Sequence, residues 1–212
     1  MATEDEVRVG LRERKKQATR IALSWAAIRL CVERGVDDVR VEDIAAEANV
    51  SLRTFRNYFS NKAEAIAARH LDRALQISDE LRVRPAGESL WEAITEAVLA
   101  RFALGQEDEG DQPPGRRWAD GVRLMLTEPT LQGEYLKATV AAQAELAAAI
   151  AERTGTDVET DVYPHLVAAA VGGAITVASD HWIRANPPVS MATLLRDAFA
   201  QLAAGLPAPG TP

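Results

Sequence analysis

The segment from residue 39 to residue 59, VRVEDIAAEANVSLRTFRNYF, constrains the fold more than any other part of the chain. It predicts two short helices, over 41–48 and 52–58, that meet at a tight turn of Asn49 and Val50. Asparagine tolerates the left-handed backbone that such a turn needs, and Ser51 is a suitable N-cap for the second helix. Apolar residues at helical spacing would form the small core: Val41, Ile44, Ala45, Val50, Phe55 and Phe59. This arrangement is typical of a helix-turn-helix.

The second of these helices carries side chains suited to DNA. We expect it to present Leu52, Arg53, Arg56 and Asn57 outward, where arginine can bond guanine O6 and N7 and asparagine can bond adenine N6 and N7. Further residues are expected to bind phosphates: Arg40, Ser51, Thr54, Tyr58 and Lys62. The predicted partner is a double-stranded DNA operator. A three-helix bundle with no DNA-binding role is the alternative interpretation of the pattern.

The charge of the chain is unevenly distributed. The net charge is −7, yet residues 8–73 hold 14 Lys and Arg against 9 Asp and Glu, whereas residues 85–212 hold 8 against 17. At moderate salt, screening limits the charges that a phosphate backbone senses to those within about 10 Å. The basic end of the chain therefore remains compatible with DNA despite the negative net charge. Four cations near the N-terminus would add salt-dependent affinity: Arg12, Arg14, Lys15 and Lys16. The alternative is that these helices are simply solvated.

The composition and the periodicity of the chain predict an all-α fold. Aromatic residues make up 5% of the chain, and runs that alternate in the manner of strands are hard to find. About nine helices are expected, with the remaining ones over 11–34, 62–84, 88–104, 116–127, 130–154, 159–185 and 190–205. Gly35 would end the first helix, and the acidic stretch 105–116 would be a loop. The expected domains are a flexible tail over 1–10, a helix-turn-helix domain over 11–62, a second helical domain over 63–205 and a tail over 206–212.

Several other classes of protein are disfavoured. Cys31 is the single cysteine, so no disulfide can form within the chain, which fits a cytoplasmic protein. The start of the chain is polar, and no uninterrupted run of about 18 apolar residues occurs, so no membrane partner is expected. The three histidines show no zinc spacing, and there is no phosphate loop or nucleophile motif. We therefore expect no catalytic residue, no metal and no cofactor, and the protein is not predicted to be an enzyme.

The stretch from Arg20 to Ile66 resembles the N-terminal domain of tetracycline-repressor-like (TetR-family) regulators. The matching pieces are AAIRLCVERG, VRVEDIAAEANVS, RTFRNYF and SNKAEAI. The resemblance implies an all-helical homodimer with a small DNA-binding domain and a larger domain for effector binding and dimerisation. Four positions depart from the usual pattern: Cys31, Asn49, Arg53 and Arg56. The two arginines leave DNA binding in place but put the operator sequence in doubt.

The later part of the chain is similar to the C-terminal domain of mycofactocin-system regulators, through RRWADGVRLMLTEPTLQGEYLKA and AERTGTDVETDVYPHLVAAAVGGAI. That resemblance implies an elongated, mostly apolar effector of acyl-coenzyme A type. The candidate pocket residues are Trp91, Ile94, Val98, Phe102, Trp118, Val122, Arg123, Met125 and Tyr163. Apolar stripes of this kind are more often plain core, and Arg123 can equally be a surface residue.

Small residues on the helix predicted over 159–185 favour a close approach to a second helix. The candidate dimer residues are Ala169, Gly172, Gly173 and Thr176. The family resemblance implies that the last two helices form the dimer interface. The alternative is that this helix is buried within one chain. The resulting hypothesis is a repressor released from a palindromic operator by a small apolar effector. An activator of the same family, or a helical small-molecule-binding protein without DNA binding, remains open.

Overall fold

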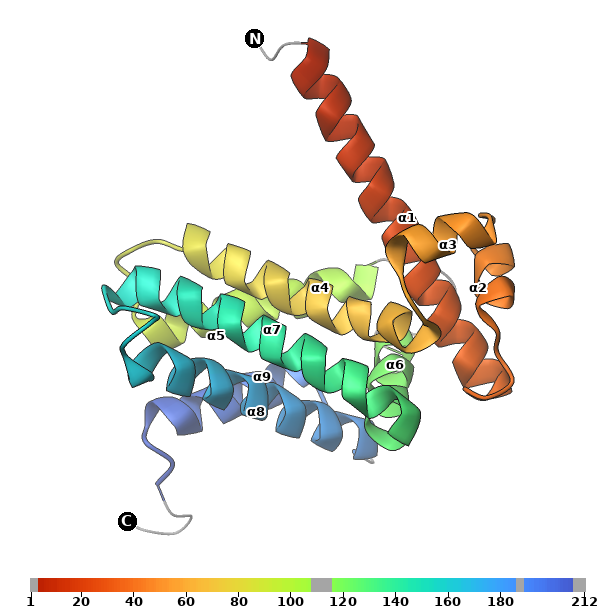
Figure 1. Ribbon diagram of the computed structural model, residues 1–212. Helices are drawn as coiled ribbons and strands as arrows, with labels where there is room; N and C mark the ends of the chain where they lie inside the picture. Colours follow the sequence, from red (N-terminus) through yellow and green to blue (C-terminus); the bar gives the residue numbers. More distant parts are fainter. Residues whose placement is uncertain (1–3, 108–115, 186–188, 208–212) are drawn as a thin grey trace. The chain divides into compact units, whose positions relative to one another are not determined.

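The computed structural model describes residues 4–107, 116–185 and 189–207 (Figure 1). Within these residues every regular element is an α-helix, which confirms the predicted all-α class. The helices are α1 (Glu4–Arg34), α2 (Val41–Glu47), α3 (Leu52–Tyr58), α4 (Lys62–Val83), α5 (Leu90–Glu107), α6 (Arg116–Thr127), α7 (Pro129–Thr154), α8 (Val162–Arg184) and α9 (Met191–Ala203). The predicted loop residues 108–115 and the last residues of the predicted tail, 208–212, lie outside the described residues.

The helix boundaries follow local chemistry. Gly35 has φ of 90°, and its N–H donates to the carbonyl of Cys31 at 3.0 Å, so α1 ends where a glycine can take the left-handed conformation. Pro129 occupies the first position of α7, where its missing N–H costs nothing. α1 begins at Glu4 rather than at the predicted Leu11. Residues 4–10 contain no proline and several good helix formers, so the sequence does not interrupt the helix there.

Two compact units make up the chain. Unit 1 contains residues 1–70 and 124–135, and unit 2 contains residues 71–123 and 136–212. The division falls within α4, α6 and α7, and residues 124–135 around the α6–α7 junction belong to the same unit as the first helices. The core of unit 1 includes Leu23, Leu30, Ile44, Phe55, Phe59 and Ile66.

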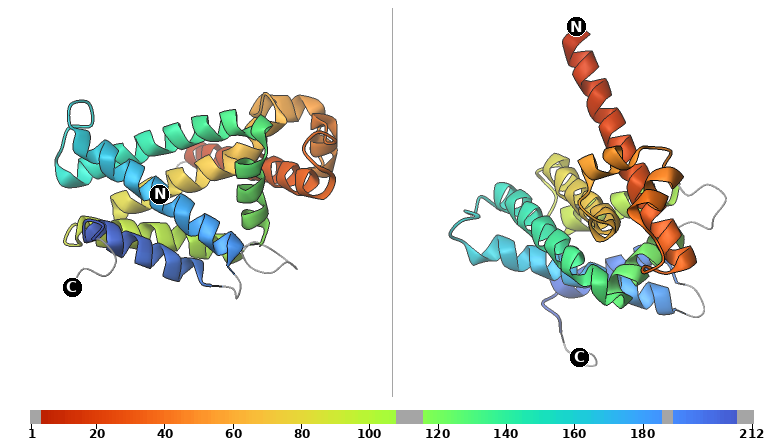
Figure 2. Two further views of the ribbon diagram at one scale, coloured as in Figure 1. Left: turned by 90° about the horizontal axis from the view of Figure 1, so that it is seen from below. Right: turned by 45° about the vertical axis from the view of Figure 1, so that its right-hand side comes forward.

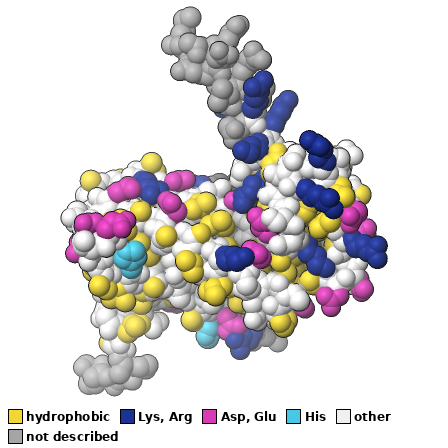
Figure 3. Space-filling view, in the orientation of Figure 1, with side chains coloured by type: hydrophobic (Ala, Val, Ile, Leu, Met, Phe, Trp, Pro, Cys, Tyr) yellow, Lys and Arg dark blue, Asp and Glu magenta, His cyan; other side chains and the backbone are white. Residues whose placement is uncertain are grey.

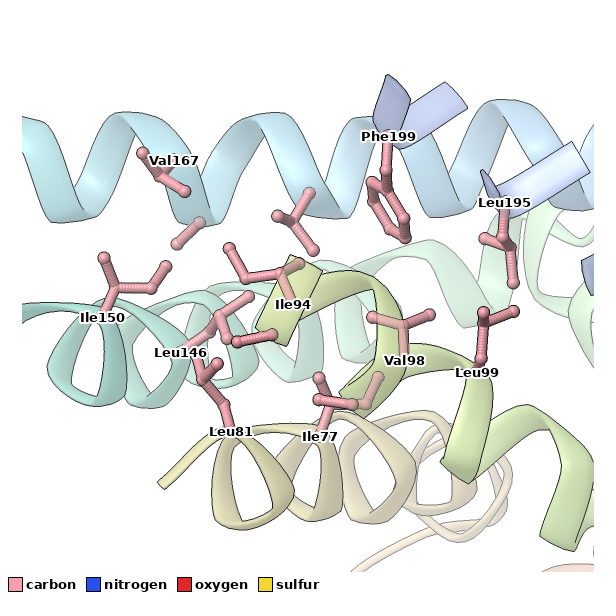
Figure 4. Packing of buried hydrophobic residues seen from close by; sticks show 14 of the residues in the cluster. Ile77, Leu81, Ile94, Val98, Leu99, Leu146, Ile150, Val167, Leu195 and Phe199 are labelled. Atoms are coloured by element: carbon pink, nitrogen blue, oxygen red, sulfur yellow. The ribbon is translucent and has the colours of Figure 1, made fainter. Parts of the chain in front are cut away.

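Unit 2 is built around a larger apolar core (Figure 4). Side chains from α4, α5, α7, α8 and α9 converge there, among them Ile77, Leu81, Ile94, Val98, Leu146, Ile150, Val167, Leu195 and Phe199. α9 packs against both α5 and α8, and the views in Figure 2 show α5 and α9 side by side. Each large apolar side chain that is fully buried in this core stabilises the folded state by about 1.5–3 kcal/mol.

α8 is the one described helix that is long and apolar enough to cross a membrane by composition alone. This qualifies the sequence-based exclusion, which counted only uninterrupted apolar runs. One side of α8 contributes Val167, Ala168, Val171 and Ala178 to the core of unit 2. The hydropathy of α8 therefore reflects core packing on that side.

Candidate nucleic-acid interface

The turn between α2 and α3 has the predicted geometry. Asn49 has φ of 55°, in the left-handed region, and the N–H of Val50 donates to the carbonyl of Ala45 at 2.9 Å. At the start of α2, the backbone N–H of Arg40 donates to the carboxylate of Asp43 at 2.9 Å, and Arg40 is exposed. The turn thus fixes the direction in which α3 leaves α2.

α3 has one buried face and one exposed face. Ser51 caps the helix, because its Oγ accepts a hydrogen bond from the N–H of Thr54 at 3.0 Å. Phe55 is fully buried, and its ring centroid lies 5.9 Å from that of Phe59. Three of the predicted base-contacting side chains are exposed on the helix: Arg53, Arg56 and Asn57. Their spacing of three and four residues places the three side chains on one face of α3.

The remaining predicted contacts on α3 lie at the edges of this face. Leu52, Thr54 and Tyr58 are half-buried, and the Tyr58 ring lies 6.5 Å from the Phe59 ring. The hydroxyls of Ser51 and Thr54 are 2.8 Å apart and share a hydrogen bond. Both hydroxyls stand at the N-terminal end of α3, which is where backbone N–H groups point toward an anion.

Lys62 is engaged inside unit 1. Its ammonium group donates to the carbonyl of Val39 at 2.9 Å and also to the carbonyl of Val36. The sequence predicted a phosphate contact for this side chain, but the structure turns it toward the α1–α2 connection. The cap of α4 is formed instead by Asn61, whose Oδ1 accepts from the N–H of Glu64 at 2.8 Å.

Three contacts that sequence reasoning missed hold the unit together. Arg29 of α1 forms an ion pair with Glu47 of α2. The Arg20 guanidinium lies 5.6 Å from the centroid of the Phe59 ring, and the Arg69 guanidinium lies 4.9 Å from the centroid of the Trp25 ring. No local pattern could have indicated them, because each joins residues far apart in the sequence. They place α1 against the helix-turn-helix and against α4.

The described cations are concentrated around this unit. In Figure 3, Lys and Arg side chains follow the projecting end of α1 and extend over the helix-turn-helix. Arg40, Arg53 and Arg56 are all exposed there. The predicted basic end of the chain therefore presents its charge at the surface, around the exposed face of α3.

The residues predicted to line an effector pocket fall into several environments. Ile94, Val98 and Phe102 are buried in the core of unit 2, Trp91 packs against that core, and Val122 is buried in the same unit. Met125 belongs to unit 1, and the side chain of Trp118 lies outside the described residues.

The polar members of the predicted pocket are at the surface. Tyr163 is 47% exposed, and Arg123 is exposed, with its guanidinium 3.9 Å from the carboxylate of Asp120. A different arginine lies closer to the core. Arg101 of α5 pairs with Glu80 of α4 at 2.8 Å, and both side chains are about three-quarters buried, at 23% and 24% exposure.

α8 presents a long apolar stripe on its outer side. Of the predicted dimer residues, Ala169, Gly173 and Thr176 are exposed, while Gly172 is half-buried beside the Gln143 side chain. Larger apolar residues that the sequence analysis did not single out continue the same stripe. They are Val162, Leu166 and Val177, which are 76%, 64% and 57% exposed. These residues lie three, four or seven positions from Ala169 or Gly173, and this helical spacing is the sequence signal that could have identified them.

Cys31 is buried in unit 1. Burial raises the pKa of its thiol, and the nearby Lys62 ammonium opposes that rise only in part. The thiol is therefore protonated and unreactive at neutral pH. Among the described residues no group of three or more His, Cys, Asp or Glu side chains could hold a metal ion.

Comparisons with known families agree with this geometry. The family model described as bacterial regulatory proteins, tetR family, matches residues 25–68, and the model described as the MftR C-terminal domain matches residues 88–207. The first match spans the helix-turn-helix, and the second covers more than half of the chain.

Relatives and solved structures agree with these matches. The chain is 33% identical to the HTH-type transcriptional regulator TcmR of Streptomyces glaucescens, over 82% of this chain and 76% of TcmR. It is 31% identical to a protein named as the mycofactocin biosynthesis transcriptional regulator MftR of Mycobacterium tuberculosis, over 95% of this chain and 96% of that one. Among solved structures, Thermus thermophilus FadR in complex with lauroyl-CoA shares the fold, with a TM-score of 0.58, 17% identity and coverage of 91% of this chain and 97% of FadR.

Proposed function

Because the chain belongs to the TetR family of bacterial transcriptional regulators, we propose that it is a homodimeric repressor of genes controlled by a near-palindromic operator. The observation that carries the proposal is the exposed face of α3, where Arg53, Arg56 and Asn57 stand together opposite the buried Phe55. A major groove admits one such helix, and a two-fold dimer would present two of them about 34 Å apart, one helical turn of DNA. The regulator would act in the cytoplasm, where the chromosome is.

Contacts at the edges of α3 would position the helix on the DNA. Ser51 and Thr54 hold hydroxyls at its N-terminal end, and Arg40 and Tyr58 flank it. Such contacts fix register and orientation, whereas the base edges are bonded by the three exposed side chains of α3. Lys62 is left out of this set because its ammonium group serves the α1–α2 connection.

A second copy of the chain would cover the outer stripe of α8. Leu166 and Val177 are exposed large apolar residues on a helix whose other side is already packed, and Gly173 between them allows a close helix approach. This stripe would place two helix-turn-helix units on one DNA duplex, as a palindrome requires.

The effector is proposed to be an elongated apolar molecule of acyl-coenzyme A type that binds in the C-terminal domain. The match to the MftR C-terminal domain and the shared fold with a lauroyl-CoA-bound repressor support this class. Within unit 2, Trp91 and Val98 would face the acyl chain. The Arg101 guanidinium pairs with Glu80, but its buried Nε makes no hydrogen bond within the described residues, and this N–H would donate to an anionic group of the ligand. Release from DNA requires the ligand to bind the DNA-free state more tightly than the DNA-bound state.

The test begins with selection of bound duplexes from a random-sequence pool by the purified full chain. Replacing Arg53 with alanine should weaken binding to the selected duplex by about 1–3 kcal/mol and relax the preference at one base pair per half-site. Arg34→Ala removes an exposed arginine of the same unit outside α3 and should leave that preference unchanged. If the full chain selects no sequence, the repressor proposal fails and a helical small-molecule-binding protein becomes the better explanation.

The effector class is tested on the same complex. Lauroyl-CoA should release the selected duplex, while coenzyme A alone should not, because it lacks the acyl chain. Arg101→Gln should raise the lauroyl-CoA concentration needed for release without changing DNA affinity. Tight DNA binding that no acyl-CoA relieves would keep the regulator and overturn the acyl effector. A reporter gene behind the selected operator, compared with and without the regulator, distinguishes repression from activation.

A further inference from the structure

A dimer formed through α8 needs more surface than α8 alone can supply. A stable protein–protein interface takes up about 800 Å² and about 20–30 residues on each partner. α8 has 23 residues, and one side of the helix is already buried in the core of unit 2. A neighbouring helix must therefore contribute to the interface. Both α7 and α9 lie beside α8 and are the candidates (Figure 2).

The exposed positions of α9 are mainly polar. They include Thr193, Arg196, Asp197 and Gln201. The Arg196 guanidinium also lies 3.6 Å from the carboxylate of Glu96 on α5. The large apolar residues of α9 are buried in the core of unit 2 or packed against it: Met191, Leu194, Leu195, Phe199 and Leu202. Because the centre of an interface is depleted of charged residues, the outer face of α9 is poorly suited to a second copy.

Large apolar residues are exposed on α7 instead. Leu136 and Val140 are 64% and 58% exposed. Gln143 marks the side of α7 that faces α8, because its side chain lies 3.2 Å from the place that a Cβ on Gly172 would take. At about 100° per residue, Leu136 and Val140 lie about 20° and about 60° from Gln143 around the axis of α7. The two apolar side chains therefore stand at the border between α7 and α8.

The exposed charges of α7 lie on another side of the helix. Lys137 and Glu145 are exposed, about 120° and about 160° from Gln143 around the same axis. Glu145 also pairs with Arg82 of α4, with the two charged groups 3.5 Å apart. The charged side of α7 is thus turned away from α8, and the border with α8 is left apolar.

The apolar stripe of α8 begins on the side that faces α7. Ala169 and Gly173 lie about 60° and about 100° from Gly172 around the axis of α8, and Leu166 and Val177 follow beyond them. In Figure 3, apolar side chains lie along the part of the visible face where Figure 1 places α7 and α8. One surface, hereafter the α7–α8 surface, joins the two stripes: Leu136, Val140, Leu166, Ala169, Gly173 and Val177.

We propose that the α7–α8 surface is where a second copy of the chain binds, and that α9 stands outside the dimer interface. The inference rests on the proposed homodimer and departs from the expectation that the last two helices form the contact. A two-fold axis would set the α7–α8 surface of one copy on that of the other, so that apolar side chains meet apolar side chains. The small residues Ala169 and Gly173 would let the helices approach closely, and Leu136 and Val140 would widen the contact beyond α8.

The experiment compares two double variants of the full chain that each add two carboxylates. Leu136→Glu with Val140→Glu changes α7, and the matched control Thr193→Glu with Gln201→Glu changes the exposed face of α9. Glutamate is a good helix former, so both helices should be kept, and thermal unfolding checks this. Sedimentation equilibrium should show that the α7 variant raises the dissociation constant of the dimer by about tenfold to about a hundredfold. The α9 variant should keep the wild-type value.

A second measurement uses milder substitutions. In a Cys31→Ala background, Val140→Cys and Gln201→Cys each place one thiol at the surface. Alkylation is followed at protein concentrations well above and well below the wild-type dissociation constant. The thiol at position 140 should react more slowly at the higher concentration, whereas the thiol at position 201 should react at one rate throughout.

The outcomes separate the inference from the proposed function. A wild type that dimerises, together with an α7 variant that dimerises equally well and a thiol at position 140 that is never protected, overturns the α7–α8 surface alone. Weaker dimerisation in the α9 variant, with protection at position 201, would give the interface to α8 and α9. A wild type that stays monomeric at every concentration would contradict both the inference and the proposed homodimer, while the duplex selection would still test DNA binding.

Discussion

Lys62, the first residue of α4, donates a hydrogen bond from its ammonium group to the carbonyl of Val39, with Nζ and O 2.9 Å apart. The same group donates to the carbonyl of Val36. Both carbonyls belong to the connection between α1 and α2, so one side chain joins the segment before the helix-turn-helix to the helix after it. A lysine in a basic sequence segment can thus stabilise the fold instead of binding a ligand.

Replacing Lys62 with methionine should destabilise the protein by about 1–3 kcal/mol, because the two carbonyls lose their charged donor while the aliphatic packing is retained. The measurement is urea unfolding of the full chain. The slope of DNA affinity against salt should stay at the wild-type value. A slope lowered by about 0.9 with unchanged stability would restore the phosphate contact that the sequence predicted. Arg56→Met, at an exposed position of α3, is the opposite control: it should change DNA binding and leave stability nearly unchanged.

Asn49 holds the turn between α2 and α3 in the left-handed region, with φ of 55°. Asn49→Ala should cost about 1–2 kcal/mol of stability, because a Cβ is disfavoured at that φ and alanine has no polar side chain to form a compensating local hydrogen bond. Asn49→Gly should be close to neutral, since glycine takes this conformation freely. Thermal and urea unfolding measure both. Asn57→Ala, on the exposed side of α3, controls for loss of the amide itself and should leave stability unchanged. Equal losses for alanine and glycine at Asn49 would assign the effect to its side chain.

Local sequence signals were enough to predict most of the fold. Gly35, Asn49 and Ser51 each impose a backbone conformation or a cap on their immediate neighbours, and the structure has them in those roles. The alternating buried and exposed positions of α3 follow from helical period alone. What the sequence did not indicate are contacts between distant segments. The Lys62 hydrogen bonds and the Arg101–Glu80 pair depend on how helices pack, and a basic residue looks alike in sequence whether it faces a phosphate or a carbonyl.

The α8 stripe should govern self-association. Leu166→Glu with Val177→Glu should weaken dimerisation by about tenfold to about a hundredfold, because four carboxylates would be desolvated in a two-fold interface. Sedimentation equilibrium over a range of concentrations measures the dissociation constant. Val83→Glu changes an apolar residue at the end of α4 that is more exposed than either, at 76%, and should leave association unchanged. A double variant that dimerises like the wild type would place the interface elsewhere.

The last prediction concerns the buried thiol of Cys31. Burial raises its pKa in the folded state above the ordinary thiol value of about 8.5, so folding is opposed once the unfolded thiol ionises. This contribution to stability is fully present below the unfolded pKa and is lost as pH rises through the folded pKa. Urea unfolding should therefore show a loss of stability above about pH 8.5 that is smaller in Cys31→Ala. In the same pH range an alkylating reagent should modify Cys31 rapidly in urea and slowly in the native protein. Rapid modification of the native protein at neutral pH would show that the thiol is accessible and that the raised pKa does not hold.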